Sequence, residues 1–159
     1  MIGKRLKPVW AYVCGIGVAL AAGGLSALSS MSGMKEFAAL DQPPLSPPGW
    51  LFPVVWCILY VLMGVSAARV YLANDARSRS ALTLWAVQLA VNALWSPIFF
   101  SLELRLVAFV WLLGLIALTV YMIGKFRSID RTSGSLQIPY LVWLLFAAYL
   151  NMGVYLLNR

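Results

Sequence analysis

The sequence predicts an all-α membrane protein, a bundle of five transmembrane helices. Of its 159 residues, 62% are apolar and 11% are charged, whereas soluble domains carry roughly 45–50% apolar and about 25% charged residues. The apolar residues gather in five blocks, each close to the length of about 20 residues that a helix needs to cross a bilayer. We therefore expect residues 1–159 to form a single five-helix transmembrane domain.

The charged and metal-binding residues argue against several other classes of protein. The net charge of +7 could indicate nucleic-acid binding, but the basic residues cluster beside the ends of the apolar blocks, as membrane topology requires. The chain has no histidine, and its two cysteines, Cys14 and Cys57, fall inside apolar blocks without a CxxC pattern. We therefore expect no nucleic-acid partner, no metal site and no disulfide framework.

The first span is predicted at about residues 9–30. Its small residues Gly15, Ala19 and Gly23 repeat every four positions, a spacing that lets two helices pack closely in a membrane. A basic start followed by an apolar run is also the pattern of a cleavable signal peptide, and this alternative stays open, although the run continues past the candidate cleavage site. Residues 31–47 then form the longest polar connection, which we expect to be a lid.

The second span is predicted at about residues 48–69, where a Pro-rich loop turns into an apolar run. Ser46 can cap this helix, and Pro47 and Pro48 can occupy its first positions, where the missing N–H of proline costs little. Pro53 should loosen the first turns. The rim of the lid is predicted to consist of Phe37, Pro47, Pro48 and Trp50.

The remaining spans are predicted at about residues 81–100, 106–124 and 136–157. Five spans put the two termini on opposite sides of the membrane. Nine of the twelve Lys and Arg residues lie at the N-terminus and around the second and fourth connections, and cytoplasmic segments carry the excess of such residues. We therefore predict a cytoplasmic N-terminus and an outside C-terminus, in a multi-pass protein of a bacterial cell membrane.

Three amides, Gln88, Asn92 and Asn151, fall inside the predicted spans, while all five acidic residues fall in the predicted connections. The lack of an intramembrane carboxylate argues against an ion-coupled carrier. Buried amides are costly unless they are paired, and these three could simply join neighbouring helices. Depth favours a more specific role, because a rise of about 1.5 Å per residue puts Asn92, Asn151 and Trp56 at one level, roughly 9–12 Å below the outer ends of their spans.

Two helical stripes face this level. They consist of Gln88, Asn92, Trp95 and Phe99 on one span and of Tyr140, Trp143, Ala147 and Asn151 on another. An aromatic-walled slot with a few amide and indole donors suits a flat apolar ligand. Trp56 and Trp143 lie too deep for the usual role of tryptophan as an interfacial anchor. Leu150, Tyr155 and Arg159 form a sterol-type pattern, although such patterns are degenerate and a terminal Tyr and Arg are more often anchors.

Three stretches carry a family resemblance: SPPGWLFPVVWCILYVLMG at 46–64, QLAVNALWSPIFF at 88–100 and PYLVWLLFAAYLN at 139–151. They resemble the translocator protein family, whose members are also called tryptophan-rich sensory proteins or peripheral benzodiazepine receptors. The resemblance implies a five-helix bundle, usually dimeric, that requires no cofactor and binds porphyrins and other flat apolar ligands, with sterols and benzodiazepine-type drugs among them. By motif position, it implies a pocket of Trp56, Tyr60, Asn92, Trp95, Trp143, Phe146, Ala147 and Leu150.

The lid departs from the family pattern. Where relatives commonly carry tryptophans and a lysine, this chain has Glu36, Leu45 and Gln42, which implies weaker stacking on a porphyrin and weaker pairing with its propionates. The predicted function is a membrane sensor of tetrapyrroles, with metal-free porphyrin preferred because histidine is absent. A facilitative transporter and a light-dependent porphyrin-degrading enzyme stay open as alternatives. The expected partners are membrane lipid and a second copy of the chain, packed through Ala86 and Ala90.

Overall fold

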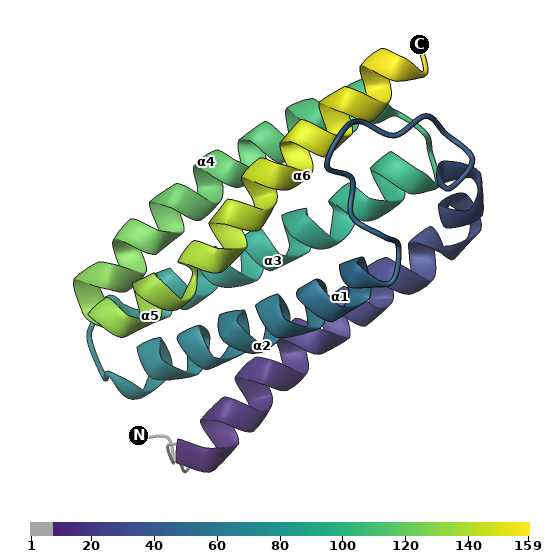
Figure 1. Cartoon of the computed structure of the whole chain (residues 1–159). Helices are drawn as coiled ribbons and strands as arrows, with labels where there is room; N and C mark the ends of the chain where they lie inside the picture. Colours follow the sequence, from purple (N-terminus) through teal and green to yellow (C-terminus); the bar gives the residue numbers. More distant parts are fainter. Residues whose placement is uncertain (1–7) are drawn as a thin grey trace.

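The computed structural model describes residues 8–159, so the predicted basic start at Lys4, Arg5 and Lys7 lies outside the described residues. Helices joined by short connections and one longer loop make up this range (Figure 1). The prediction of five spans is confirmed, because five helical segments are long and apolar enough to cross a membrane. The helices are α1 (Pro8–Phe37), α2 (Leu51–Leu72), α3 (Ser78–Phe100), α4 (Arg105–Ile129), α5 (Arg131–Leu136) and α6 (Ile138–Leu157).

Helix α1 is longer than the sequence predicts. It runs to Phe37, so the connection predicted at 31–47 is shortened to residues 38–50. Glu36, which was predicted in a connection, therefore lies in the last turn of a helix. We call residues 38–50 the lid loop.

The polar end of α1 stays helical because it packs on α3. The Ser26 hydroxyl donates to the carbonyl oxygen of Ala93 at 2.8 Å, and one turn later the Ser30 hydroxyl donates to the hydroxyl oxygen of Ser96 at 2.8 Å. At Gly33 the two backbones come so close that a Cβ would lie 1.9 Å from the carbonyl oxygen of Phe100. Small polar residues thus extend the helix where hydropathy alone predicts its end.

Helix α2 begins at Leu51, so the prediction that it begins at Pro48 is wrong. The N–H of Leu51 donates to the carbonyl oxygen of Pro48 at 2.9 Å, and Ser46, predicted to cap the helix, donates its hydroxyl to the carbonyl oxygen of Pro43 at 2.8 Å. The later start puts Pro53 in the first turn, where helix N–H groups have no intrahelical partner in any case. Pro53 therefore costs α2 little.

The last predicted span, 136–157, is preceded by a short helix that hydropathy does not reveal. Helix α5 begins after Asp130, whose carboxylate accepts hydrogen bonds from the N–H of Ser133 at 3.1 Å and from its hydroxyl at 2.6 Å. An aspartate in this position satisfies N–H groups that the first turn leaves unpaired. The spans predicted at 81–100 and 106–124 lie inside α3 and α4.

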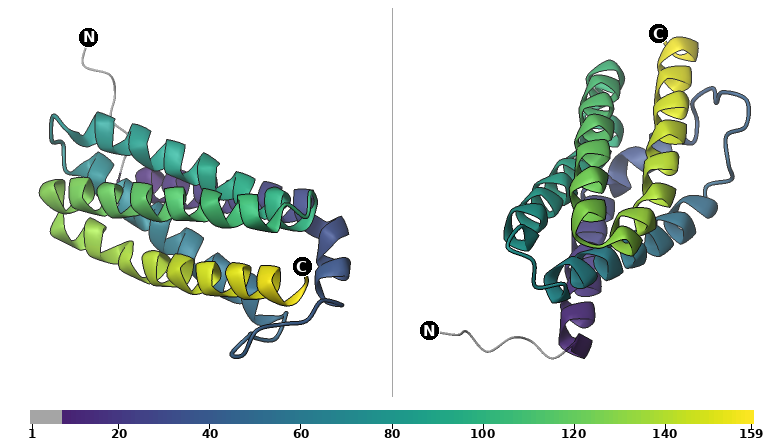
Figure 2. Two further views of the ribbon diagram at one scale, coloured as in Figure 1. Left: turned by 90° about the horizontal axis from the view of Figure 1, so that it is seen from above. Right: turned by 90° about the vertical axis from the view of Figure 1, so that its left-hand side faces the viewer.

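The most extensive helix contact joins α1 to α2. A Cβ on Gly15 would lie 2.5 Å from the carbonyl oxygen of Gly64, and one on Gly23 would lie 2.2 Å from the ring of Tyr60. Ala19 is fully buried between them. Helix α4 packs against α3 and α6, while α2 and α6 touch only sparsely, and Figure 2 shows how the long helices lie side by side. The bundle is thus tight at α1–α2 and loose at α2–α6.

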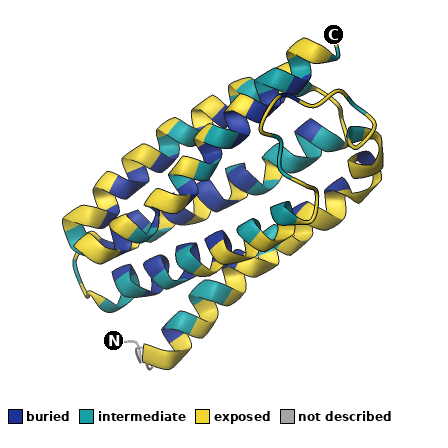
Figure 3. Cartoon of the chain, in the orientation of Figure 1, coloured by how far each residue is buried: buried dark blue, intermediate teal, exposed yellow. Residues whose placement is uncertain are grey.

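The two ends of the bundle differ chemically. The lid loop and the C-terminus lie at one end, which we call the loop end (Figure 1). The other end, which we call the basic end, carries Arg77, Arg79, Lys125, Arg127 and Arg131. Between the ends, exposed apolar side chains cover the outer faces (Figure 3), as contact with lipid requires. Which end faces the cytoplasm stays a prediction.

Candidate ligand-binding site between α2, α3 and α6

Four aromatic rings from α2 and α6 meet inside the bundle. Trp56 stacks on Tyr60 with ring centroids 5.4 Å apart and 28° between the planes. Trp143 meets Trp56 edge-on at 6.4 Å and 86°, and Tyr140 lies 6.3 Å from Trp56. Each pair comes from one helical face, because residues three or four apart point the same way. We call these four rings the aromatic cluster.

Two amides of α3 hold the tyrosines of this cluster. Asn92 donates an Nδ2 hydrogen to the hydroxyl oxygen of Tyr60 at 3.0 Å, and Gln88 donates an Nε2 hydrogen to the hydroxyl oxygen of Tyr140. Both amides are buried, and within residues 8–159 neither Asn92 Oδ1 nor Gln88 Oε1 has a hydrogen-bond partner. A buried acceptor left unpaired costs about 1–3 kcal/mol. The interior next to the aromatic cluster therefore holds two buried acceptors without a partner in the described residues.

Asn151 does not join this group. Its Oδ1 accepts a hydrogen bond from the Trp95 indole at 3.4 Å, and its Nδ2 donates to the carbonyl oxygen of Arg105 at 2.8 Å. Trp95 in turn stacks on Phe99 at 5.3 Å and 18°. Asn151 and Trp95 thus tie α3, α4 and α6 together near the loop end, which is the packing role that the sequence left open for the intramembrane amides.

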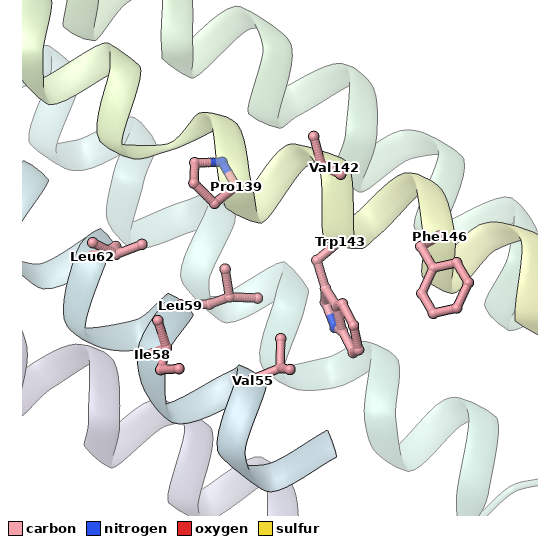
Figure 4. A pocket seen from close by; sticks show the side chains of 8 residues that line it. All are labelled: Val55, Ile58, Leu59, Leu62, Pro139, Val142, Trp143 and Phe146. Atoms are coloured by element: carbon pink, nitrogen blue, oxygen red, sulfur yellow. The ribbon is translucent and has the colours of Figure 1, made fainter. Parts of the chain in front are cut away.

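An apolar groove of about 450 Å³ lies beside the aromatic cluster, between α2 and α6 (Figure 4). This volume falls in the range of about 300–1,000 Å³ that is usual for ligand sites. The Trp143 indole reaches from α6 toward α2 in the wall of the groove (Figure 4) and also contacts the Trp56 ring. Ile58 and Val142 are 56% and 59% exposed, so the groove opens onto the lipid-facing surface. The lining residues are Val55, Ile58, Leu59, Leu62, Pro139, Val142, Trp143 and Phe146.

The lid loop is fastened to α6. The Tyr149 hydroxyl donates to the carbonyl oxygen of Pro44 at 2.7 Å. Asn158 makes two bonds to Asp41, accepting from its N–H at 3.0 Å and donating to its carbonyl oxygen at 2.9 Å. At Gly153 a Cβ would lie 2.6 Å from the Pro43 ring. The loop therefore follows α6 at the loop end of the bundle.

The predicted rim residues differ in their surroundings. Phe37 packs edge-on against Phe99 at 5.5 Å, so it belongs to the apolar packing under the loop. Trp50 is 67% exposed at the start of α2, which suits an interfacial anchor. Pro47 is half-buried and Pro48 is exposed, and both lie in the lid loop.

The remaining predicted residues divide between three places. Phe146 lines the groove, and Ala147 and Leu150 are buried on the same face of α6. Tyr155 and Arg159, the end of the sterol-type pattern, line a separate hollow of about 260 Å³ together with residues of the first turn of α4. Ala86 and Ala90 are exposed on the outer face of α3, where a second copy could pack, and dimerisation stays a prediction.

Sequence reasoning missed Phe52 and the aliphatic wall of the groove. Phe52 lies 5.9 Å from Trp143, and its spacing of four residues from Trp56 was a signal that could have found it. The wall, with Val55 and Leu59, gave no such signal because these residues are typical of any span. Within residues 8–159, no three His, Cys, Asp or Glu side chains gather as a metal site would require.

Comparison with known proteins identifies the family. The model of the TspO/MBR family matches residues 14–157. Protein CrtK of Rhodobacter capsulatus is 43% identical over 125 residues, which cover 77% of this chain and 78% of the relative. The tryptophan-rich sensory protein of Cereibacter sphaeroides is 39% identical over 124 residues, covering 75% and 74%, and the translocator protein of Ovis aries is 32% identical over 162 residues, covering 97% and 94%. The bacterial relatives support a bacterial membrane as the location. With five apolar helices and this match over nearly its whole length, the chain is a membrane-embedded member of the TspO/MBR family.

Proposed function

We propose that this protein is a membrane sensor that binds a flat apolar ligand, with metal-free porphyrin as the best candidate, between α2, α3 and α6. The names "tryptophan-rich sensory protein" and "translocator protein" among the relatives support a role in sensing or moving a ligand. Which ligand binds, and where it binds, depends on the chemistry of the aromatic cluster.

One observation carries the proposal: the half-buried rings of Trp56 and Trp143, packed with the buried Tyr60 and Tyr140, stand beside an unpaired amide oxygen. Trp56 and Trp143 present flat faces and edges that suit a planar ring system. Asn92 Oδ1 is buried without a partner in the described part of the chain, and a ligand that carries an N–H or O–H donor at its edge would satisfy it. An apolar wall with a few well-placed polar groups is the usual composition of a ligand site.

The chemistry of the chain favours a porphyrin without a metal. No histidine is present anywhere in the sequence, and histidine is a common axial ligand of haem iron. A free-base porphyrin needs no axial ligand, so the absence of histidine does not weaken its binding. Sterols and drug-like aromatic molecules share the apolar character but are not planar over the same area.

A second candidate function, facilitated movement of a lipophilic molecule, is favoured by the groove between α2 and α6. This groove opens onto the lipid-facing surface, so a ligand could pass between the bilayer and the interior. Ligand-dependent flux in proteoliposomes would distinguish movement across the membrane from binding alone.

The test is binding of protoporphyrin IX to the full chain in nanodiscs, followed by tryptophan quenching and by the absorption of the porphyrin. Trp56→Phe and Asn92→Leu should each raise Kd by about 10- to 100-fold, because each removes a stacking or hydrogen-bonding contact worth roughly 1–3 kcal/mol. Trp10→Phe is the matched control, since Trp10 is exposed on α1 and its loss should leave Kd unchanged. If both site variants bind as tightly as wild type, the ligand does not use the aromatic cluster.

A further inference from the structure

We propose that the groove between α2 and α6 is an access site, which takes flat apolar molecules directly from the hydrocarbon of the bilayer and passes them to the aromatic cluster. This inference rests on the proposed function, because it concerns how the ligand reaches that site. Three features carry it: the contacts that hold α2 to α6, the way the two helices are fastened at their ends, and the position of Trp143.

Ring contacts hold α2 to α6 along the groove. Phe52 and Trp56 of α2 meet Trp143 at 5.9 and 6.4 Å, and within residues 8–159 no hydrogen bond or ion pair is seen between α2 and α6. Apolar contacts of this kind keep two helices together poorly in a membrane, since lipid tails solvate the separated faces as well as another helix does. Opening this contact therefore breaks ring contacts but no hydrogen bond or ion pair between the described residues of α2 and α6.

The basic end of the same pair is fastened by polar groups. The Arg69 guanidinium pairs with the Asp130 carboxylate through Nε at 2.6 Å and Nη2 at 3.2 Å. The Ser66 hydroxyl donates to the carbonyl oxygen of Ser133 at 2.8 Å. These contacts tie α2 to α5, and α5 leads directly into α6. The basic end is therefore a fixed point about which the other ends of α2 and α6 can separate.

The loop end has no comparable fastening between α2 and α6. The longest-range hydrogen bonds of the lid loop join Pro44 and Asp41 to α6, through Tyr149 and Asn158. A further side-chain bond, from Gln42, returns to the end of α1. These bonds of the lid loop to Tyr149 and Asn158 do not involve α2, so within residues 8–159 α2 can swing away from α6 without breaking them.

Trp143 belongs both to the wall of the groove and to the aromatic cluster. Its indole lines the groove on one side (Figure 4) and contacts Trp56 on the other. A change of its side-chain rotamer would join the groove to the aromatic cluster without moving the backbone of α6. The groove walls are aliphatic and aromatic and open at mid-span, where only molecules dissolved in the hydrocarbon are present.

The experiment fills the groove and measures the rate of binding. Leu62→Phe and Val142→Phe add bulk to the groove and leave the aromatic cluster intact. Val61→Phe and Leu145→Phe are matched controls on the same two helices, at exposed positions outside the groove. Each variant, as the full chain in nanodiscs, is mixed with protoporphyrin IX in a stopped-flow instrument, and tryptophan quenching is recorded at several ratios of porphyrin to lipid.

The access site predicts that the groove variants slow association and dissociation together by at least about tenfold, because overfilling a packed space raises the barrier to passage. Their Kd should stay that of wild type, the controls should keep wild-type rates, and the wild-type rate should follow the ratio of porphyrin to lipid. Unchanged rates in the groove variants overturn the proposal and point to access beside the lid loop. A weaker Kd with an unchanged association rate also overturns it, since the groove would then be the final binding site. Absence of quenching in wild type refutes the proposed function itself, which keeps the two failures distinct.

Discussion

Removal of the carboxylate of Asp130 should destabilise the bundle at its basic end. This side chain performs two tasks: it caps α5 through Ser133, and it accepts two hydrogen bonds from Arg69 of α2. The Arg69 guanidinium holds the pKa of the Asp130 carboxyl well below its usual range, with the bonds from Ser133 acting in the same direction. Asp130→Ala removes both the cap of α5 and the ion pair with Arg69, whereas Asp130→Asn keeps a capping oxygen and removes only the charge.

The loss in free energy of unfolding can be worked out from these contacts. A lost N-cap costs about 1 kcal/mol. The ion pair adds about 0.2–1 kcal/mol, because the Arg69 side chain is 37% exposed and solvent screens the pair. Asp130→Ala should therefore lose about 1–2 kcal/mol, or roughly 2–8 °C in Tm for a chain of this size. Asp130→Asn should lose only the smaller, ion-pair part.

The assay is thermal unfolding in detergent micelles, followed by circular dichroism and tryptophan fluorescence between pH 3 and pH 7. Because the folded pKa of Asp130 is lowered, its contribution is fully present above the unfolded value of about 3.9 and is lost as the pH falls through the folded value. Wild type should therefore lose more stability than Asp130→Asn as the pH falls below about 4.

Asp75→Asn provides the matched control. Arg77 likewise holds the pKa of the Asp75 carboxyl below its usual range, but the two residues lie two apart in sequence, and the bond from Arg77 Nη2 to the carbonyl oxygen of Ser128 in α4 does not use the Asp75 carboxylate. Part of this pairing persists in the unfolded chain, so Asp75→Asn should leave Tm unchanged. The reasoning is refuted if Asp130→Ala melts with wild type, or if the Asp75 and Asp130 variants lose equal stability.

Two further predictions concern the interior. Gly64→Ala should lower Tm by several degrees, because its Cβ would lie 2.4 Å from the Cα of Ile16. Gly114→Ala, with open space around it, should instead raise Tm slightly, because alanine favours helix. Circular dichroism melts of the two variants test this, and equal melting temperatures would contradict it. Gln137→Leu should raise Tm, since this fully buried amide has no hydrogen-bond partner for either polar atom within residues 8–159. An apolar side chain of similar size removes the free-energy cost of burying unpaired polar atoms. A fall in Tm would mean that the amide is hydrogen-bonded in the folded protein.

Hydropathy was sufficient for the number of spans but not for their ends. The apolar runs specify which segments cross the bilayer, because burying backbone in lipid demands helix. The ends depend on partners distant in sequence: Ser26 and Gly33 extend α1 only because α3 lies beside them. Likewise, Asp130 starts α5 through a short-range cap that carries no hydropathy signal. Such contacts are visible only once the helices are placed.

The candidate site could be predicted where helical spacing and chemistry agreed. Trp56 and Tyr60 share a face of α2, and Asn92 indeed lies against Tyr60. Asn151 was grouped with them by its depth and by its stripe on the last span, but neither specifies which neighbouring helix a side chain meets. Its partners are Trp95 and the start of α4, a choice made by the rotation of α6 in the bundle. The groove was beyond prediction because it is a gap between two ordinary apolar faces.

The lid loop shows how the departures from the family pattern act together. Leu45 lies at the tip with φ of 68°, a left-handed conformation that costs a non-glycine residue about 1–2 kcal/mol, and its side chain is 82% exposed. Gln42, in place of lysine, bonds back to the Phe37 carbonyl oxygen at 3.1 Å. Leu45 is exposed and Gln42 bonds back to the end of α1, so the bonds to Tyr149 and Asn158 hold the loop to the end of α6. Because these bonds do not involve α2, they can persist while α2 and α6 separate, as access through the groove requires.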